Sequence, residues 1–237
     1  MTLDNNTTFW LWLGFTGMLI GALTILSFWG RFNPKHRYHV AIAFLITLIA
    51  SVAYYVMATG HGTIEVGDKT VFYARYVDWI LTTPLLLLSL VFVGLPAVSD
   101  PSKKRQRTRL ISALIVSDIA MIVTGAIANI TSPIFDKTVW YVVSVGLLLF
   151  VLWMLFGRVR QEAKRYNLKS YMSLLTFLTV LWVLYPVVWL IGNSELSLIS
   201  TSSEAAIYAI LDVTAKSVFG VILLVSLLGV KGKKSRS

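Results

Sequence analysis

The stretch AILDVTAKSVFGVILL, residues 209–224, sets two charged residues, Asp212 and Lys216, into an otherwise apolar run. Because they are four residues apart, they share one face if the run forms a helix. If that helix crosses a membrane, both charges lie near hydrocarbon, where an ionised side chain costs several kcal/mol. The rest of the sequence must explain why the pair is there.

The composition of the whole chain is that of a membrane protein. Of its 237 residues, 57% are hydrophobic and 14% are charged, whereas soluble proteins carry about 25% charged residues. Apolar runs of about 20 residues are typical of membrane-spanning helices, and the connectors between them are short. We therefore expect an all-α bundle of seven transmembrane helices forming one domain over residues 1–237, with spans at 8–30, 38–59, 71–94, 107–129, 138–158, 169–191 and 204–229.

Residues that bind metals in proteins are scarce. The chain has no cysteine and three histidines, His36, His39 and His61, none of them in the middle of an expected span. The lack of cysteine excludes disulfides and thiolate metal sites, and the histidine positions argue against metal or haem chemistry. We expect no metal site.

The net charge of +10 is unevenly distributed along the chain. All but four of the 21 lysines and arginines fall in three alternate connectors and the C-terminal tail, at 31–37, 103–109, 158–169 and 231–236. By the positive-inside rule, the side of the membrane that these segments share is cytoplasmic. The sequence thus predicts an outside N-terminus, a cytoplasmic C-terminus and no nucleic-acid partner.

Away from the ends of the expected spans, five charged residues remain inside the membrane. They are two bases, Arg75 and Lys216, and three acids, Asp78, Asp118 and Asp212. Ionisable residues inside a membrane usually mark a functional path. The alternative is that one or two of them form ion pairs that only hold helices together.

The third span carries a polar stripe. Arg75, Asp78, Thr82, Leu86 and Ser89 follow one another in steps of three and four, so they line one helix face. A base, an acid and two hydroxyls on one face indicate a proton or ion track. Hydroxyls that bond their own helix carbonyls would explain the threonine and the serine, but not the two charged residues.

The sixth span has an aromatic face with a proline in its middle. Its members stand at i, i+3, i+4 and i+7: Trp182, Tyr185, Pro186 and Trp189. Such a stripe is more often core packing than a binding site, but Trp182 lies away from the interfacial belts where tryptophan is enriched. A flat apolar ligand held between rings is therefore a reasonable alternative.

A lone lysine in an aromatic, apolar pocket is suited to imine chemistry, because a neutral amine attacks an aldehyde. A protonated imine then needs buried counter-ions. Asp212, one turn from Lys216, and Asp78, from another helix, would supply them, and Arg75 would bring the site to two positive and two negative charges. Asp118, left without a basic partner, is expected to be neutral and hydrogen-bonded.

Three segments match the signatures of a known family. RYVDWILTTPLLLL (75–88), LWVLYPVVWLIG (181–192) and LDVTAKSVFG (211–220) occur in the expected order. The sequence resembles the microbial (type 1) rhodopsins over essentially its whole length. These are seven-helix proteins that carry all-trans retinal on a lysine of the last helix.

The resemblance implies roles for individual residues. Lys216 is similar to the lysine that binds retinal as a protonated Schiff base, Asp78 to the primary proton acceptor, Asp212 to the second counter-ion, and Arg75 to the arginine that gates the outer half-channel. Thr82 is expected to assist transfer to Asp78. Further residues match positions of the retinal pocket: Trp79, Thr83, Leu86, Asp118, Met121, Gly125, Trp140, Ser144, Trp182, Tyr185, Pro186 and Trp189.

Two positions depart from the best-known outward pumps. Those pumps carry a carboxylic acid, the internal proton donor, where this chain has Ser89, and serine does not titrate usefully. The outer glutamates Glu195 and Glu204 resemble the family's proton-release pair, although Glu195 lies one residue further from Trp189 than usual.

An Asp–Thr–Ser triplet together with Asp212 most resembles the cyanorhodopsins, a clade of light-driven outward proton pumps. The resemblance implies a transporter rather than an enzyme, in a bacterial plasma membrane, in contact with lipid and protons and associated as a homo-oligomer, with a trimer favoured. Tyr141 stands where antenna-binding relatives keep a glycine, so we expect no carotenoid.

Two other functions remain open. A photosensor with a slow cycle would signal to a cytoplasmic partner through the basic connectors. A ligand-activated receptor of the animal seven-helix type is disfavoured, because no cysteine is available for its usual disulfide and Lys216 would be unexplained.

Overall fold

The computed structural model describes residues 3–67, 69–95, 100–131, 134–164, 168–192 and 198–234. In this part of the chain, seven helical stretches are long and apolar enough to cross a membrane, which confirms the predicted fold class. The helices are α1 (Asn5–Leu26), α2 (Tyr38–Ala58), α3 (Tyr73–Gly94), α4 (Pro101–Ile130), α5 (Ile134–Met154), α6 (Arg160–Ala163), α7 (Leu168–Gly192), α8 (Thr201–Val213) and α9 (Phe219–Lys234).

Two of the seven stretches are continuous through a π-helical turn. The turn Leu155–Val159 joins α5 to α6, and the turn Thr214–Val218 joins α8 to α9. Short 3₁₀ turns at Trp29–Arg31 and Pro34–His36 connect α1 to α2. A helix bonds all its backbone groups internally, which is what a segment in hydrocarbon requires.

Most helices begin a few residues from the start of the expected span: α1 begins at Asn5 rather than 8, α5 at Ile134 rather than 138, and α8 at Thr201 rather than 204. Two further starts have a visible local cause. The fourth helix begins at Pro101 rather than 107, because Asp100 caps it by accepting from the backbone N–H groups of Ser102 (2.8 Å) and Lys103 (3.3 Å). The third begins at Tyr73 rather than 71, because β1 (Ile64–Val66) and β2 (Lys69–Val71) form an antiparallel hairpin before it.

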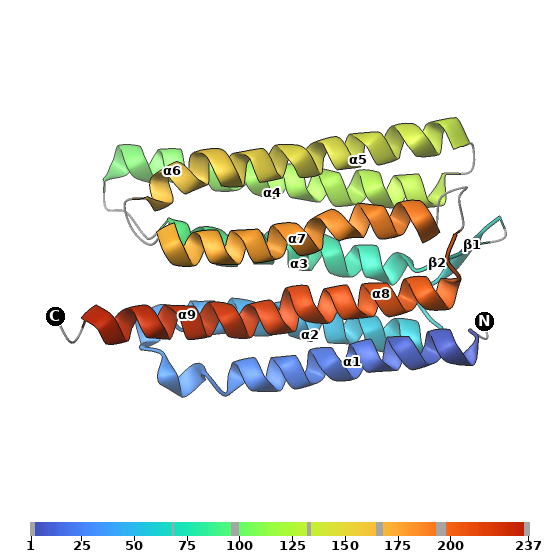
Figure 1. Ribbon diagram of the computed structural model, residues 1–237, viewed down its shortest axis with the longest axis horizontal. Coiled ribbons are helices and arrows are strands. Elements are labelled where there is room, and N and C mark those ends of the chain that lie inside the picture. The colour runs from blue at the N-terminus through green and yellow to red at the C-terminus, as the bar shows by residue number, and fades with distance from the viewer. Residues whose placement is uncertain are drawn as a thin grey trace.

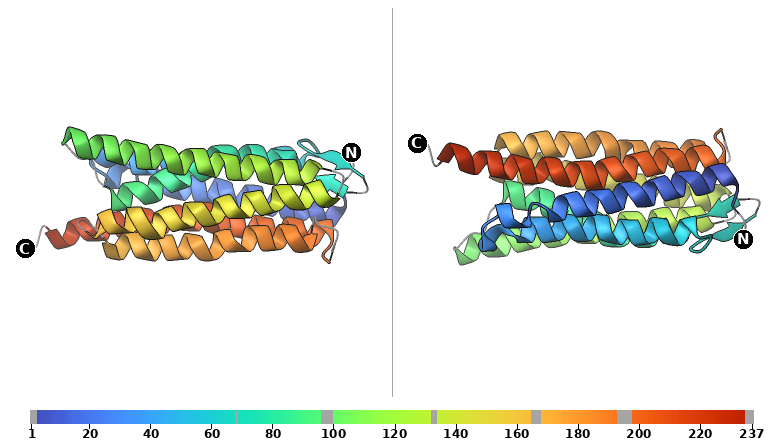
Figure 2. Two further views of the ribbon diagram at one scale, coloured as in Figure 1. Left: turned by 90° about the horizontal axis from the view of Figure 1, so that it is seen from above. Right: turned by 90° about the horizontal axis from the view of Figure 1, so that it is seen from below.

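The helices run along one long axis, and the two termini lie at opposite ends of the bundle (Figure 1). We call these the N-terminal end and the C-terminal end. The β1–β2 hairpin covers part of the N-terminal end (Figures 1 and 2). Helix α1 packs against α2 and α8, α3 lies between α2 and α4, and α4 packs against α5.

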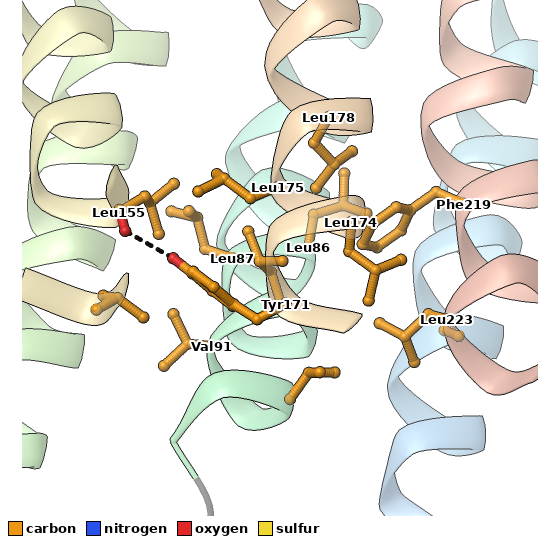
Figure 3. Close-up of a cluster of buried hydrophobic side chains, with 14 of the residues drawn as sticks. Leu86, Leu87, Val91, Leu155, Tyr171, Leu174, Leu175, Leu178, Phe219 and Leu223 are labelled. Carbon is orange, nitrogen blue, oxygen red and sulfur yellow. Dashed lines mark hydrogen bonds between the residues drawn. The ribbon is translucent and has the colours of Figure 1, made fainter. Parts of the chain in front are cut away.

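The C-terminal half of the bundle is filled by apolar side chains. Leu86, Leu174, Phe219 and Leu223 converge there from three different helices (Figure 3). The Tyr171 hydroxyl, buried in the same cluster, donates to the carbonyl of Leu155 at 2.8 Å. The outer surface is apolar as well, with large side chains such as Phe135 (74% exposed) facing outward, as expected for a lipid-facing bundle.

Candidate functional site

The π-helical turn between α8 and α9 carries Lys216, which is 2% exposed. Such turns widen a helix by one residue and occur frequently at functional sites. The stripe that leads to it from the N-terminal end runs in steps of four along one helix face: Glu204, Tyr208, Asp212 and Lys216. The buried lysine thus stands at the inner end of a polar face.

Lys216 lies between two buried aspartates, one on each side. Its ammonium donates to Asp78 Oδ2 and lies 3.2 Å from Asp212 Oδ1. All three side chains are at most 1% exposed. The structure therefore brings together the residues that the spacing on α3 and on the last helix predicted to meet.

The two aspartates differ in their other partners. Asp212 Oδ1 accepts from the Trp79 indole N–H (3.2 Å) and the Tyr185 hydroxyl (2.9 Å), and its Oδ2 accepts from the Tyr54 hydroxyl (2.8 Å). Asp78 Oδ1 has no hydrogen-bond partner among the described residues. Asp212 is a carboxylate fixed on both oxygens, whereas Asp78 keeps one oxygen available for a proton.

Arg75 lies on the N-terminal side of this cluster and is 4% exposed. Its Nη1 is 3.4 Å from Glu204 Oε1. The guanidinium carbon lies 4.3 Å from the ring centre of Tyr208 and 5.2 Å from that of Phe72, both of them cation–π contacts. The arginine thus faces away from Lys216 and toward Glu204. Glu195, the other predicted release residue, lies outside the described residues.

The hydroxyls of the α3 stripe have separate environments. The Thr82 hydroxyl donates to the carbonyl of Asp78, four residues earlier, at 2.9 Å. This is the bond to the helix's own backbone that was the alternative to a role in a proton track. Ser89 is 2% exposed, and its Oγ has no partner among the described residues. Ser89 lies on the C-terminal side of Asp78, within the apolar half.

A cavity extends from Lys216 across to α4 and α5. Its volume is about 100 Å³, and most of its wall is formed by aromatic and aliphatic side chains, which suits an apolar molecule. Twelve of the thirteen predicted pocket residues line it: Trp79, Thr83, Leu86, Asp118, Met121, Gly125, Ser144, Trp182, Tyr185, Pro186, Trp189 and Lys216.

The remaining residue, Trp140, was also predicted to line the pocket, and this prediction is wrong. It does not line the cavity and is 36% exposed. Its neighbour Tyr141 takes the place on the wall, where its ring stacks on Trp189 (4.6 Å between centres, 12° between planes) and its hydroxyl donates to the carbonyl of Pro186 at 3.1 Å. Successive residues of an α-helix point about 100° apart, so a shift of one residue turns the tryptophan away from the cavity.

The far wall of the cavity is shaped by Gly125 and Asp118. A Cβ on Gly125 would lie 3.2 Å from Ser144 Oγ, so the bare Cα keeps that wall open. The Thr83 hydroxyl lies 2.7 Å from Asp118 Oδ2 and 2.8 Å from the carbonyl of Trp79. Because one hydroxyl has one proton, both contacts are satisfied if Asp118 is protonated and donates to Thr83.

Two tyrosines that contact the charged residues of the site were not predicted from the sequence. Tyr54 donates to Asp212, and Tyr208 supports Arg75 and lines the cavity. Tyr208 could have been found from its place four residues before Asp212. Tyr54 had no such signal, because its partner lies on another helix.

Comparisons with known proteins identify relatives over nearly the whole chain. The family model described as bacteriorhodopsin-like protein matches residues 5–230. The bacteriorhodopsin of Haloterrigena sp. (strain arg-4) is 38% identical, covering 92% of this chain and 86% of the relative. Cruxrhodopsin-3 of Haloarcula vallismortis is 34% identical, covering 94% and 91%.

Solved structures agree with the fold. The thermophilic rhodopsin from Rubrobacter xylanophilus superposes with a TM-score of 0.87 at 37% identity, covering 93% of this chain and 95% of that one. A cyanorhodopsin from Calothrix sp. NIES-2098 gives 0.82 at 36% identity, covering 93% and 94%. The light-driven proton pump of Coccomyxa subellipsoidea gives 0.85 at 30% identity, covering 95% and 98%.

Proposed function

The chain belongs to the bacteriorhodopsin-like family of microbial type 1 rhodopsins, and from this premise we propose that it is a light-driven outward proton pump. The observation that carries the proposal is the position of Lys216 between Asp78 and Asp212, on the wall of an apolar cavity. Relatives that are described as proton pumps support it.

The chromophore is proposed to be all-trans retinal, held in a single domain formed by residues 1–237. When it is bound to Lys216 as a protonated Schiff base, retinal supplies the absorption of visible light and a change of shape that turns the N–H on Lys216. The residues fit such a group: Lys216 is the only lysine among the described residues that line the cavity, Trp182 and Trp189 contribute rings to its wall, and the bare Cα of Gly125 leaves room on the wall beside Ser144.

The proton steps follow from the different partners of the two aspartates. Lys216 Nζ holds the proton at rest, and Asp78 takes it, because Asp78 has an oxygen with no other partner among the described residues. Asp212 stays ionised, since three donors saturate its oxygens. Arg75, which faces Glu204, then stabilises the negative charge on the glutamate as a proton leaves on that side.

The direction of transport follows from the charge distribution. The basic connectors lie at the C-terminal end of the bundle, so that end is assigned to the cytoplasm and the N-terminal end to the outside. We place the protein in a bacterial plasma membrane as a homo-oligomer, with a trimer favoured. Tyr141 fills the cavity wall by stacking on Trp189, so no carotenoid is expected there.

A photosensor is the second candidate, and one observation favours it. Ser89 supplies no carboxylic acid in the cytoplasmic half, and a slow return of the proton to Lys216 would suit signalling better than transport.

The test that separates the two functions is light-driven pH change. Cells that express the protein with retinal are illuminated in a lightly buffered suspension, with and without a protonophore. A pump acidifies the medium, and the protonophore abolishes the change. The matched control is Asp78→Asn, which should produce no acidification. A pigment that bleaches and recovers in light without moving protons would refute the pump and leave the sensor.

A further inference from the structure

The cytoplasmic half of the bundle presents an apolar barrier to a proton that returns to Lys216. The cluster includes Leu86, Phe219 and Leu223 (Figure 3), each at most 1% exposed. Leu90, 0% exposed, belongs to the same cluster. Ser89 lies in this region, but its hydroxyl does not exchange protons usefully at neutral pH. Rapid return of a proton therefore calls for a titratable group at the edge of the barrier.

One buried imidazole stands at that edge. His39 is 5% exposed at the cytoplasmic end of α2. It begins a buried stripe that follows one face of α2 in steps of three and four: His39, Ala43, Thr47, Ala50 and Tyr54. The last member of this stripe donates to Asp212. The face of α2 that carries the histidine is thus the face that reaches the ion cluster.

The level of His39 along the bundle can be derived from a contact between helices. A Cβ placed on Gly220 would lie 3.5 Å from the Cβ of Ala43, so these two residues are at the same height. Gly220 follows Lys216 by four residues, and His39 precedes Ala43 by four. At 1.5 Å per residue, the backbone of His39 lies about 12 Å beyond that of Lys216 toward the cytoplasm.

Ring contacts relate His39 to Ser89. The rings of His39 and Tyr38 are 4.1 Å apart, and Tyr38 makes an edge contact with Phe92 at 5.8 Å. Phe92 follows Ser89 by three residues on α3. His39 therefore lies between the level of Ser89 and the cytoplasmic surface.

The charged groups on the elements around this end of α2 are mostly basic; they include Lys35 on the connection from α1 and one acid, Asp100, at the N-cap of α4. Arg31 and Arg37 lie on the connection from α1, and the guanidinium of Arg107 on α4 lies over Phe92 at 5.1 Å. The other ionisable neighbours are the Tyr38 phenol and the exposed His36, whose rings are 6.4 Å apart. An imidazole has an ordinary pKa of about 6.5 and exchanges protons near neutral pH, which neither arginine nor tyrosine does.

We propose that His39 is the proton relay of the cytoplasmic half. Its imidazole takes a proton from the cytoplasm and gives it, past Ser89, to Lys216 Nζ after Nζ has passed its own proton to Asp78. The imidazole, again neutral, takes the next proton from the cytoplasm, so one proton enters for each one released. The direction of this relay rests on the proposed pumping function.

Flash photolysis tests the relay through the rate at which Lys216 Nζ regains its proton, seen as recovery of the visible band. In the wild type, the rate should follow the protonated fraction of His39. It should be level at low pH and fall about tenfold per pH unit above the midpoint. His39→Gln should lose the level part and be slower by about tenfold or more at neutral pH. The matched controls are His36→Gln and His61→Gln, which change exposed histidines and should behave as the wild type does.

A second measurement does not depend on transport. In the double variant His36→Gln/His61→Gln, nitrogen NMR of labelled histidine reports His39 alone, with or without retinal. The midpoint of its titration should equal the kinetic midpoint measured in the same protein. If His39→Gln yields no pigment, the agreement between the NMR midpoint and the kinetic midpoint decides whether His39 is the relay.

Two results would overturn the relay. One is a His39→Gln recovery that coincides with the wild type at every pH, and the other is a disagreement between the two midpoints. Neither readout requires net transport, so a wild type that fails to acidify the medium would refute the pump without bearing on the relay.

Discussion

The two halves of the bundle on either side of Lys216 differ in what fills them. On the outer side, Asp78, Asp212, Arg75 and Glu204 lie within one cluster of ion pairs, hydrogen bonds and ring contacts. On the cytoplasmic side, apolar residues such as Leu90 fill the space, and the polar groups Ser89 and His39 are set apart from the cluster.

This difference supports the proposed direction of transport. A proton that leaves Lys216 has Asp78 as a partner within hydrogen-bonding distance, and the Arg75–Glu204 pair lies further along on the side proposed to face outward. On the cytoplasmic side, an apolar medium excludes an unpaired charge. If the protein pumps as proposed, return of the proton from that side is expected to be the slow step. The same barrier prevents leakage of the proton that has just left.

The largest expected effect comes from replacing Lys216, which lies between the two halves. Lys216→Ala should abolish visible absorption of the retinal-reconstituted protein, because the attachment point is lost. The control is Lys137→Ala, which removes a second lysine that is 8% exposed but does not line the cavity, and which should keep the band. A visible band in Lys216→Ala would refute the assignment of the attachment site, and absorption spectra decide it.

The second largest effect is expected from replacing Asp78 in the outer half. Asp78→Asn should shift the band to the red and stop acidification, because it removes both a counter-ion and the proton acceptor. In the wild type, acid should produce a similar red shift as Asp78 protonates, and this shift should be missing in the variant. Asp118→Asn is the control and should still pump, since Asp118 makes no contact with Lys216. Light-driven acidification by Asp78→Asn would contradict the role of Asp78 as proton acceptor.

The outer half was the more predictable of the two. Membrane spans carry few ionisable residues, so Asp78, Asp212 and Lys216 could be paired from spacing and charge balance alone. The seven spans were predictable for a similar reason, because hydrocarbon demands long apolar helices. Family resemblance implied separate roles for Arg75 and Glu204, but the contact between them is a finding of the structure.

The remaining features depend on packing that spacing does not specify. Helix α5 has aromatic residues on more than one face, so Trp140 and Tyr141 could be told apart only by which one meets Trp189. His39 falls at the edge of a span, where histidine is ordinary. Its ring packs at 4.1 Å against that of Tyr38, which in turn contacts Phe92 of α3, and spacing along α2 does not specify this contact between helices.

The cytoplasmic half should respond most to a new acid at Ser89. Ser89→Asp places a donor nearer to Lys216 than His39, provided that the aspartate holds a proton in its apolar surroundings. Recovery of the proton on Lys216 should become up to about 10²-fold faster and less dependent on pH. Ser89→Asn is the control, because it matches the shape without a proton to give. Flash photolysis across the pH range measures both variants, and equal rates would show that the barrier lies elsewhere.

The smallest expected effect concerns Tyr208, whose ring contacts both Arg75 and Trp79 in the outer half. Its ring lies 4.3 Å from the Arg75 guanidinium carbon and 5.5 Å from the ring of Trp79, so it stands between the arginine and the cavity. Cation–π contacts contribute about 0.5 to 2 kcal/mol, and a net loss of about 1 kcal/mol is expected here because Arg75 keeps its contact with the ring of Phe72. Tyr208→Leu should therefore weaken the outward-facing position of Arg75 and slow proton release by about fivefold, while the visible band changes little.

Tyr208→Phe is the matched control: it keeps the ring and loses only a long 3.4 Å bond from the hydroxyl to the carbonyl of Tyr185, so its release should match the wild type. A pH-indicating dye follows release after a flash. Equal delays in both variants would assign the effect to the hydroxyl rather than the ring, and no delay in either would mean that Glu204 alone holds Arg75 in place.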